Sequence, residues 1–163
     1  MYDRDTTLAL LHEYTKTDGL RKHAYAVSAA MRAAAVRTGN DEEYWAAVGL
    51  LHDFDYEMYP DAPDHPQKGA DILREKGYPE EFVRTILSHA TYTGVPREND
   101  CAKWLFAVDE LCGLAMACAM VQPDKKIAQV KVKSVKKKLK KKDFAAKVNR
   151  EEINVGAEDL GLE

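Results

Sequence analysis

The residues with the clearest capacity for chemistry are four histidines and two aspartates. They are His23, His52, Asp53, His65, His89 and Asp109. His52 and Asp53 are adjacent at the end of an apolar run, where an imidazole or a carboxylate must be hydrogen-bonded, paired or bound to a metal ion. The adjacent pair therefore predicts a polar partner inside the fold.

The spacing of these six residues favours a metal site built between helices. With His52 and Asp53 counted as one step, the successive intervals are 29, 12, 24 and 20 residues, or about one candidate ligand per predicted helix. Zinc fingers hold their ligands close together in sequence, whereas a helical bundle builds a site from facing helices. Nitrogen and oxygen donors without a thiolate suit one or two divalent ions, either Mn, Fe, Mg or a catalytic Zn.

Each histidine taken alone has a simpler explanation. A core histidine is commonly satisfied by a backbone carbonyl, and His65, which precedes Pro66, could be an exposed cap at a helix start. The combination favours a metal, because several separate helices direct such residues at the same core. His12 lies outside the pattern and is predicted to be structural or at the surface.

The elements that must position these residues are helices. Apolar residues recur with the helical period, and strand-like alternation is scarce. Asp41 can cap one helix, Pro66 suits the first turn of another, and Gly39 and Gly77 suit helix ends. We therefore expect an all-α fold, a single compact helical bundle with the metal site in its core. The predicted helices cover residues 5–16, 19–38, 41–54, 65–77, 79–90 and 100–121, with one or two more in the remainder.

Asp109 is the polar residue whose predicted surroundings are most apolar. Its neighbours on the same helical face are Leu105, Phe106, Cys112 and Met116. A carboxylate in such a stripe needs a cation or several hydrogen-bond donors.

Composition places the chain among ordinary globular proteins. Its 163 residues are 45% hydrophobic and 31% charged, which fits one domain spanning 1–163. No apolar run approaches the length of a membrane span, and the acidic start lacks the pattern of a signal peptide. The three cysteines form no CxxC pair, so we expect a cytoplasmic protein with no membrane partner.

The net charge of −3 conceals a basic segment near the C-terminus. Residues 125–147 hold 11 of the 24 Lys and Arg residues and one acid, Asp143, for a segment charge of +10. The segment could be an amphipathic helical arm whose lysines face water, a surface that gathers phosphate, or a contact for nucleic acid. The lysines have no aromatic residues among them, which weakens single-strand binding by stacking.

The ordered series His…His-Asp…His…His…Asp resembles the HD-domain superfamily of metal-dependent phosphohydrolases. HPQKGADIL (65–73) and ILSHAT (86–91) are similar to the extended HD pattern, in which two further histidines complete a two-metal site. LLHDFDYE, AVDELCGLAMA, VQPDKK and KSVKKKLKKKDFAAKVNRE resemble a subgroup of small, stand-alone predicted HD hydrolases. The lysine of the HDIGK variant is replaced here by Tyr56.

The resemblance implies a role for each residue of the series. The implied core ligands are His23, His52, Asp53 and Asp109. Asp53 would be the catalytic residue that bridges two metals, and His65 and His89 would hold the second metal. Lys68, and less securely Arg21 and Lys22, are predicted to bind phosphate; Asp55 and Glu57 could orient a histidine or take a proton.

The predicted function is hydrolysis of a nucleotide or another small phosphorylated metabolite by a metal-activated water. Two alternatives remain open from the sequence. One is a di-iron oxygenase of the HD type, and the other is a non-catalytic, metal-stabilised binding or scaffold domain. In the second case residues 125–147 would contact nucleic acid, a partner that is possible but less expected than a small phosphorylated substrate.

Overall fold

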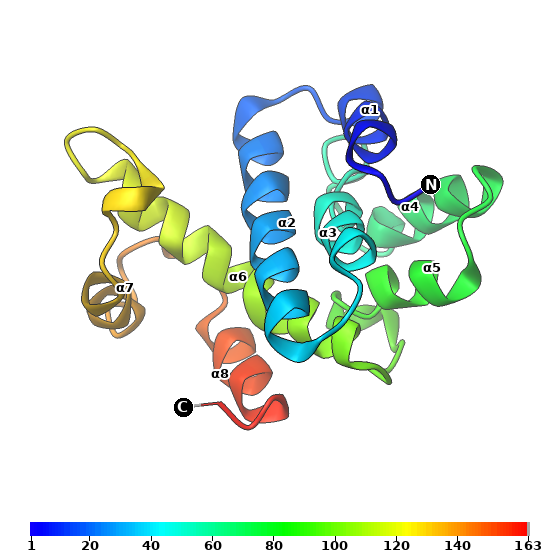
Figure 1. Ribbon diagram of the computed structural model, residues 1–163. Helices are drawn as coiled ribbons and strands as arrows, with labels where there is room; N and C mark the ends of the chain where they lie inside the picture. The colour runs from blue at the N-terminus through cyan, green and yellow to red at the C-terminus, as the bar shows by residue number, and fades with distance from the viewer. Residues whose placement is uncertain (163) are drawn as a thin grey trace. The chain divides into compact units, whose positions relative to one another are not determined.

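The chain folds entirely into helices, as the sequence predicts. The computed structural model describes residues 1–162, which contain eight α-helices, two short 3₁₀ turns and no strand (Figure 1). The helices are α1 (Arg4–Tyr14), α2 (Asp18–Thr38), α3 (Glu42–Leu51), α4 (Asp64–Glu75), α5 (Glu80–Leu87), α6 (Asp100–Met120), α7 (Val132–Leu139) and α8 (Arg150–Asp159). The chain forms two compact units, Met1–Phe106 and Ala107–Glu163, so the single HD domain over 1–163 stays a prediction.

The ends of the first helices are fixed by capping residues that the sequence identifies. The Asp41 carboxylate accepts a hydrogen bond from the backbone N–H of Tyr44 at 2.9 Å, which confirms it as the N-cap of α3. Gly39 ends α2 with a φ of 72°, a left-handed conformation that favours glycine. The turn between α2 and α3 is therefore short.

Helices α2 and α3 pack closely side by side (Figure 1). At Gly49 a Cβ atom would lie 2.9 Å from the carbonyl oxygen of Val27 and 2.9 Å from the Met31 side chain. Glycine is therefore the residue that permits this close approach. The packing brings α2, which carries His23, against the helix that ends just before His52.

Aromatic rings join the N-terminal segment to α3 and α5. The Tyr2 ring packs edge-on against Tyr44 at 5.0 Å and stacks on Phe82 at 5.3 Å. Phe82 is fully buried, and Tyr78 also contacts it. Burial of these rings stabilises the packing of α3 and α5, the helices that precede His52 and His89.

Three helix boundaries next to candidate ligands differ from the predicted ones. α3 ends at Leu51 with His52 as its C-cap, so Asp53 lies in the following turn rather than in the helix. Within α4, His65 and Pro66 have non-helical backbone angles, so Pro66 does not occupy a regular first turn as predicted. α5 ends at Leu87, so His89 lies after the helix rather than within the predicted range 79–90. All three differences occur where a candidate ligand lies outside regular helix.

The second unit is organised around a glycine and an arginine. A Cβ at Gly156 would lie 2.5 Å from the Cα of Ala107, so α8 packs directly on the start of that unit's helical segment. The Arg150 guanidinium donates hydrogen bonds to five backbone carbonyls, those of Leu139, Lys141, Phe144, Ala145 and Val148. Much of the lysine-rich segment is therefore folded chain rather than a loose tail.

Candidate metal centre

The carboxylate of Asp53 is surrounded by four histidine rings of the first unit. Its Oδ1 lies 3.2 Å from Nε2 of His65 and 3.2 Å from Nε2 of His89. Its Oδ2 lies 3.4 Å from Nε2 of His52 and 4.0 Å from Nε2 of His23. The two oxygens of one side chain thus face two different pairs of imidazoles.

The four histidines reach this point from four separate segments. His23 lies in α2, His52 caps α3, His65 lies at the non-helical start of α4, and His89 follows α5. The ring centroids of His52 and His89 are 5.3 Å apart, and those of His65 and His89 are 5.4 Å apart. The convergence of these residues in the fold is what the sequence spacing predicts.

Three of the rings are oriented through their other nitrogen. Nδ1 of His52 donates to the carbonyl oxygen of Gly49 at 2.8 Å, and Nδ1 of His89 donates to that of Ile86 at 2.6 Å. Nδ1 of His65 lies 2.9 Å from Oδ1 of Asp55. In each ring Nε2 is consequently the atom turned toward Asp53, which is the arrangement that metal-ligating histidines show.

The centre is buried on one side and open on the other. The side chain of His52 is fully buried, and His65 and His89 are buried as well. The side chains of Asp53 and His23 remain 22% and 19% exposed. An ion held by Asp53 would therefore be accessible to solvent or to a small ligand.

The electrostatics of the site suit a cation. Burial alone would raise the pKa of Asp53, but the charge of His52 and hydrogen bonds from three histidines hold that pKa well below its usual range. Burial acts to lower the pKa of His65, but hydrogen bonds with Asp53 and Asp55 raise it to about 9. Asp53 is thus an anion at neutral pH, a charge that favours a cation beside its oxygens.

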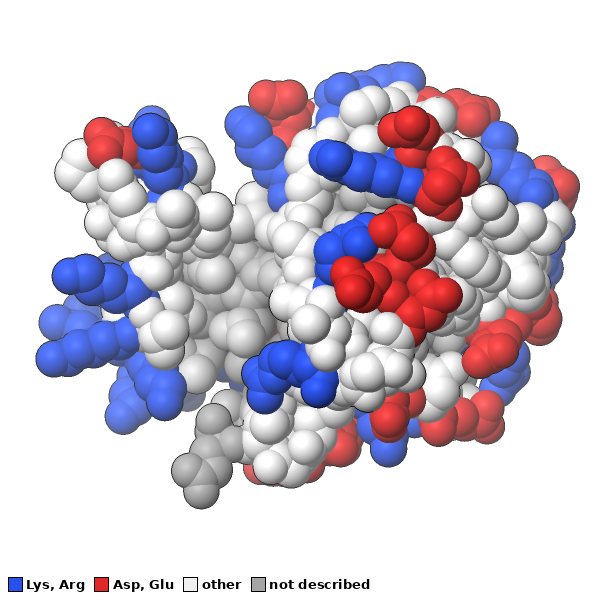
Figure 2. Space-filling model, in the orientation of Figure 1, with Lys and Arg blue, Asp and Glu red and all other residues white. Residues whose placement is uncertain are grey.

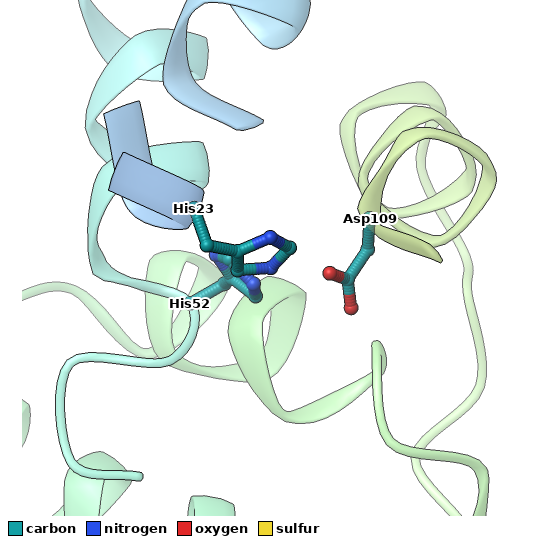
Figure 3. Close-up of side chains that lie close together, drawn as sticks. All are labelled: His23, His52 and Asp109. Atoms are coloured by element: carbon teal, nitrogen blue, oxygen red, sulfur yellow. The ribbon is translucent and has the colours of Figure 1, made fainter. Parts of the chain in front are cut away.

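The donor set fits a divalent metal. One ligand atom each from Asp53, His65 and His89 lie within 4.8 Å of one another, which identifies them as a group that could hold an ion. His23 and His52 belong to a second candidate group with Asp109. Figure 3 draws these three side chains; Asp109 lies on α6 beyond the end of the first unit, and its role as a ligand stays a prediction.

The predicted phosphate-binding cations differ in their present contacts. Lys68 is exposed in α4, three residues after His65. Nε of Arg21 donates to the carbonyl oxygen of Thr15 at 2.7 Å, and Nζ of Lys22 lies 3.4 Å from Asp18. Their binding of phosphate stays a prediction.

The structure shows different surroundings for Asp55 and Glu57, which the sequence alone does not distinguish. Asp55 is 1% exposed and contacts His65, whereas Glu57 lies at the surface and accepts hydrogen bonds from Lys16 and Thr17 at the start of α2. Asp55 is therefore the one that contacts a histidine of the centre. His12, outside the pattern, bonds through Nε2 with the hydroxyl of Tyr25 at 2.6 Å.

Two residues near the centre were not identified from the sequence. The hydroxyl of Tyr92 donates to the backbone carbonyl of His65 at 2.8 Å, and the Tyr56 ring packs edge-on against the His65 ring at 5.2 Å. Tyr92 lies in a short 3₁₀ turn, for which the sequence carries no periodic signal. In the sequence Tyr56 stands out only because it replaces a lysine, whereas in the structure its ring packs against His65.

The lysine-rich segment 125–147 forms a strongly basic surface. Figure 2 shows basic side chains gathered over α7, a helix that has no buried residue. Within the described chain none of the eleven lysines forms an ion pair, although Nζ of Lys138 lies 4.1 Å above the centre of the Phe144 ring. Ten of the eleven lysines are exposed, and Lys138 is half-buried.

None of the described helices combines the length and apolar character that a bilayer crossing requires.

Comparison with known proteins places the chain in a family. The HD domain model matches residues 20–113, which is more than half of the chain and includes all six residues of the predicted series. Neither a curated protein nor a solved structure matches the chain. The four histidines around Asp53 and the match over residues 20–113 lead to one assignment: this chain belongs to the HD domain family.

Proposed function

We propose that this chain is a metal-dependent phosphohydrolase that acts on a nucleotide or another small phosphorylated metabolite through a metal-activated water. HD domains are generally metal-dependent phosphohydrolases. The observation that carries the proposal is the position of Asp53, whose two oxygens face different pairs of histidines. A carboxylate so placed can bridge two metal ions, an arrangement suited to in-line displacement at phosphorus.

The proposed ligand set divides between the two oxygens of Asp53. On the Oδ2 side the ligands are His23 and His52, with Asp109 as the proposed terminal carboxylate. On the Oδ1 side they are His65 and His89. A divalent ion bound here would lower the pKa of a coordinated water toward neutrality.

The protein's own side chains would orient the ligands, exclude water and bind the phosphate group. The Nδ1 hydrogen bonds of His52, His65 and His89 hold the rings in place before substrate arrives. Burial of these rings excludes water from one side, and the partial exposure of Asp53 leaves the other side open to a phosphate group. Lys68 is the proposed anion-binding residue, because its exposed ammonium lies on α4 close to His65 in sequence.

The test is a phosphate-release assay on the purified chain loaded separately with Mn²⁺, Mg²⁺, Zn²⁺ or Fe²⁺. The substrates are nucleoside mono-, di- and triphosphates, together with ribose 5-phosphate and glycerol phosphate as esters without a base. We expect turnover that chelation abolishes and that the Asp53→Asn variant lacks. An absence of release from every substrate by fully loaded protein would contradict the proposal.

Two alternative functions are tested by separate measurements on the same purified protein. Oxygen consumption by the iron-loaded protein, with a mixed-valence iron signal, would indicate an HD-type oxygenase. Salt-dependent binding of nucleic acid through residues 125–147 without turnover would indicate a non-catalytic binding domain. We also propose a cytoplasmic location.

A further inference from the structure

We infer that Asp55 is a positioning residue that, together with Gly69, sets the tautomer of His65 and thereby the affinity for a second metal ion. The inference rests on the proposed function, since it assigns a role at the same centre. Its first evidence is that Asp55 is almost completely buried and uses both carboxylate oxygens. Oδ1 lies 2.9 Å from Nδ1 of His65, and Oδ2 accepts the backbone N–H of Gly69 at 3.0 Å.

The first contact determines which nitrogen of His65 can bind metal. When Nε2 binds a metal ion the ring keeps one proton, and the ionised carboxylate of Asp55, which only accepts hydrogen bonds, holds that proton on Nδ1. The lone pair is then on Nε2, the atom that lies 3.2 Å from Oδ1 of Asp53. The opposite tautomer would direct an N–H group toward the metal position.

His65 differs from the other two rings, because its Nδ1 bonds to a side chain and not to a backbone carbonyl. His52 and His89 donate Nδ1 to carbonyl oxygens three residues earlier, at Gly49 and Ile86. His65 has a ψ of 136°, and its Nδ1 bonds instead to a side chain ten residues earlier. Removal of the Asp55 carboxylate therefore removes the hydrogen-bond acceptor that the structure shows for this nitrogen.

Gly69 holds the carboxylate from the other side. Its N–H, in the first turns of α4, donates to Oδ2 of Asp55 at 3.0 Å. A Cβ at position 69 would lie 2.6 Å from Cγ of Asp55 and 2.9 Å from each oxygen. Since Asp55 is buried, any other residue at position 69 would displace the carboxylate and with it the ring of His65.

The first arm of the test measures Mn²⁺ binding by calorimetry to the wild-type chain, Asp55→Asn and Gly69→Ala. The control is Asp64→Asn, which removes an exposed carboxylate next to His65 in sequence. We expect the weaker of two Mn²⁺ sites to lose about 10- to 100-fold in affinity in both variants, with the tighter site retained. Wild-type affinity at both sites in folded Asp55→Asn would overturn the inference.

The second arm needs no variant. Nitrogen-15 NMR of the wild-type chain loaded with diamagnetic Zn²⁺ reports which ring nitrogen of His65 carries the proton. We expect the proton on Nδ1, and finding it on Nε2 would overturn the inference even if both variants fail to fold. This arm stands if the protein proves to hydrolyse no phosphate, so the two failures are distinguishable.

Discussion

The candidate metal centre and the lysine-rich segment 125–147 both concentrate ionisable residues, yet they place charge in opposite ways. At the centre one carboxylate is shared by four histidines from four segments, and three of those rings are buried. In segment 125–147 eleven lysines face outward from α7 and its flanking turns and form no ion pair within the described chain. Burial requires that each polar group have a specified partner, whereas exposure leaves the partner to solvent.

This contrast predicts that one substitution at the centre lowers metal content and activity more than any substitution at the basic surface. Asp53→Asn removes the negative charge that the histidines surround, so we expect loss of bound metal and a fall in phosphohydrolase kcat of at least about 10³-fold. Metal per chain by elemental analysis and a phosphate-release assay measure both effects. Asp61→Asn, which changes an exposed loop carboxylate, is the control, and full metal content in Asp53→Asn would break the comparison.

The second prediction concerns heat stability of the metal-loaded protein. An ion that binds only the folded chain stabilises it by about 2.7 kcal/mol at 100 times its Kd. For a chain of this length we therefore expect chelation to lower Tm by about 5–10 °C. Differential scanning calorimetry with and without EDTA measures the shift, and a Tm that does not change would contradict a centre that binds metal in the folded state.

The third prediction tests the packing that brings two ligand-bearing segments together. Gly49→Ala places a methyl group 2.9 Å from a backbone oxygen of α2, so we expect a loss of about 1–3 kcal/mol in the free energy of unfolding. Gly19→Ala is the matched control, because nothing lies within 4 Å of that position in the same helix pair. Urea denaturation of both variants measures the difference, and equal stability would mean that α2 can shift without cost.

The fourth prediction concerns a smaller effect, the pH dependence of stability that the surface residue Glu57 causes. Glu57 accepts hydrogen bonds from the backbone N–H groups of Lys16 and Thr17 at the start of α2, and these bonds lower the pKa of its carboxyl group. A lowered folded-state pKa means that the stabilisation is present above the unfolded pKa of about 4.3 and is lost as the pH falls through the folded value.

We therefore expect Glu57→Gln to lower Tm at pH 7 and to match the wild type at strongly acidic pH. Thermal melts between pH 3 and pH 8 measure this convergence. Glu75→Gln, at an exposed position of α4, should show no such pH-dependent difference. A constant gap between wild type and Glu57→Gln across this range would show that the charge of Glu57 is not the cause.

The sequence predicts most of the fold because helices carry local signals. Asp41 and Gly39 mark helix ends through capping and backbone conformation, which depend on a few neighbouring residues. The convergence of His23, His52, His65 and His89 is also predictable. Apolar helix faces pack into one core, so the single polar residue that each face carries is brought close to the others. Ligand roles beyond this convergence rest on the resemblance to the HD family.

The parts of the centre that the sequence cannot predict depend on contacts between loops and helices. Asp55 and Glu57 are both acids after His-Asp, and only the fold shows that Asp55 bonds to His65 and to the N–H of Gly69. Tyr92 reaches His65 from a 3₁₀ turn 27 residues away. Such pairings are set by tertiary packing and leave no periodic pattern in the chain.

The smallest predicted effect comes from the basic surface and sharpens the contrast with the centre. Lys136, Lys137 and Lys140 are exposed and unpaired, so changing all three to Gln should alter the free energy of unfolding by no more than about 0.5 kcal/mol. Relief of repulsion among like charges makes a slight gain in stability the expected sign. Urea denaturation and metal content measure the result: a loss above about 1 kcal/mol would mean that these lysines stabilise the fold, and a loss of metal would mean that the basic segment supports the centre.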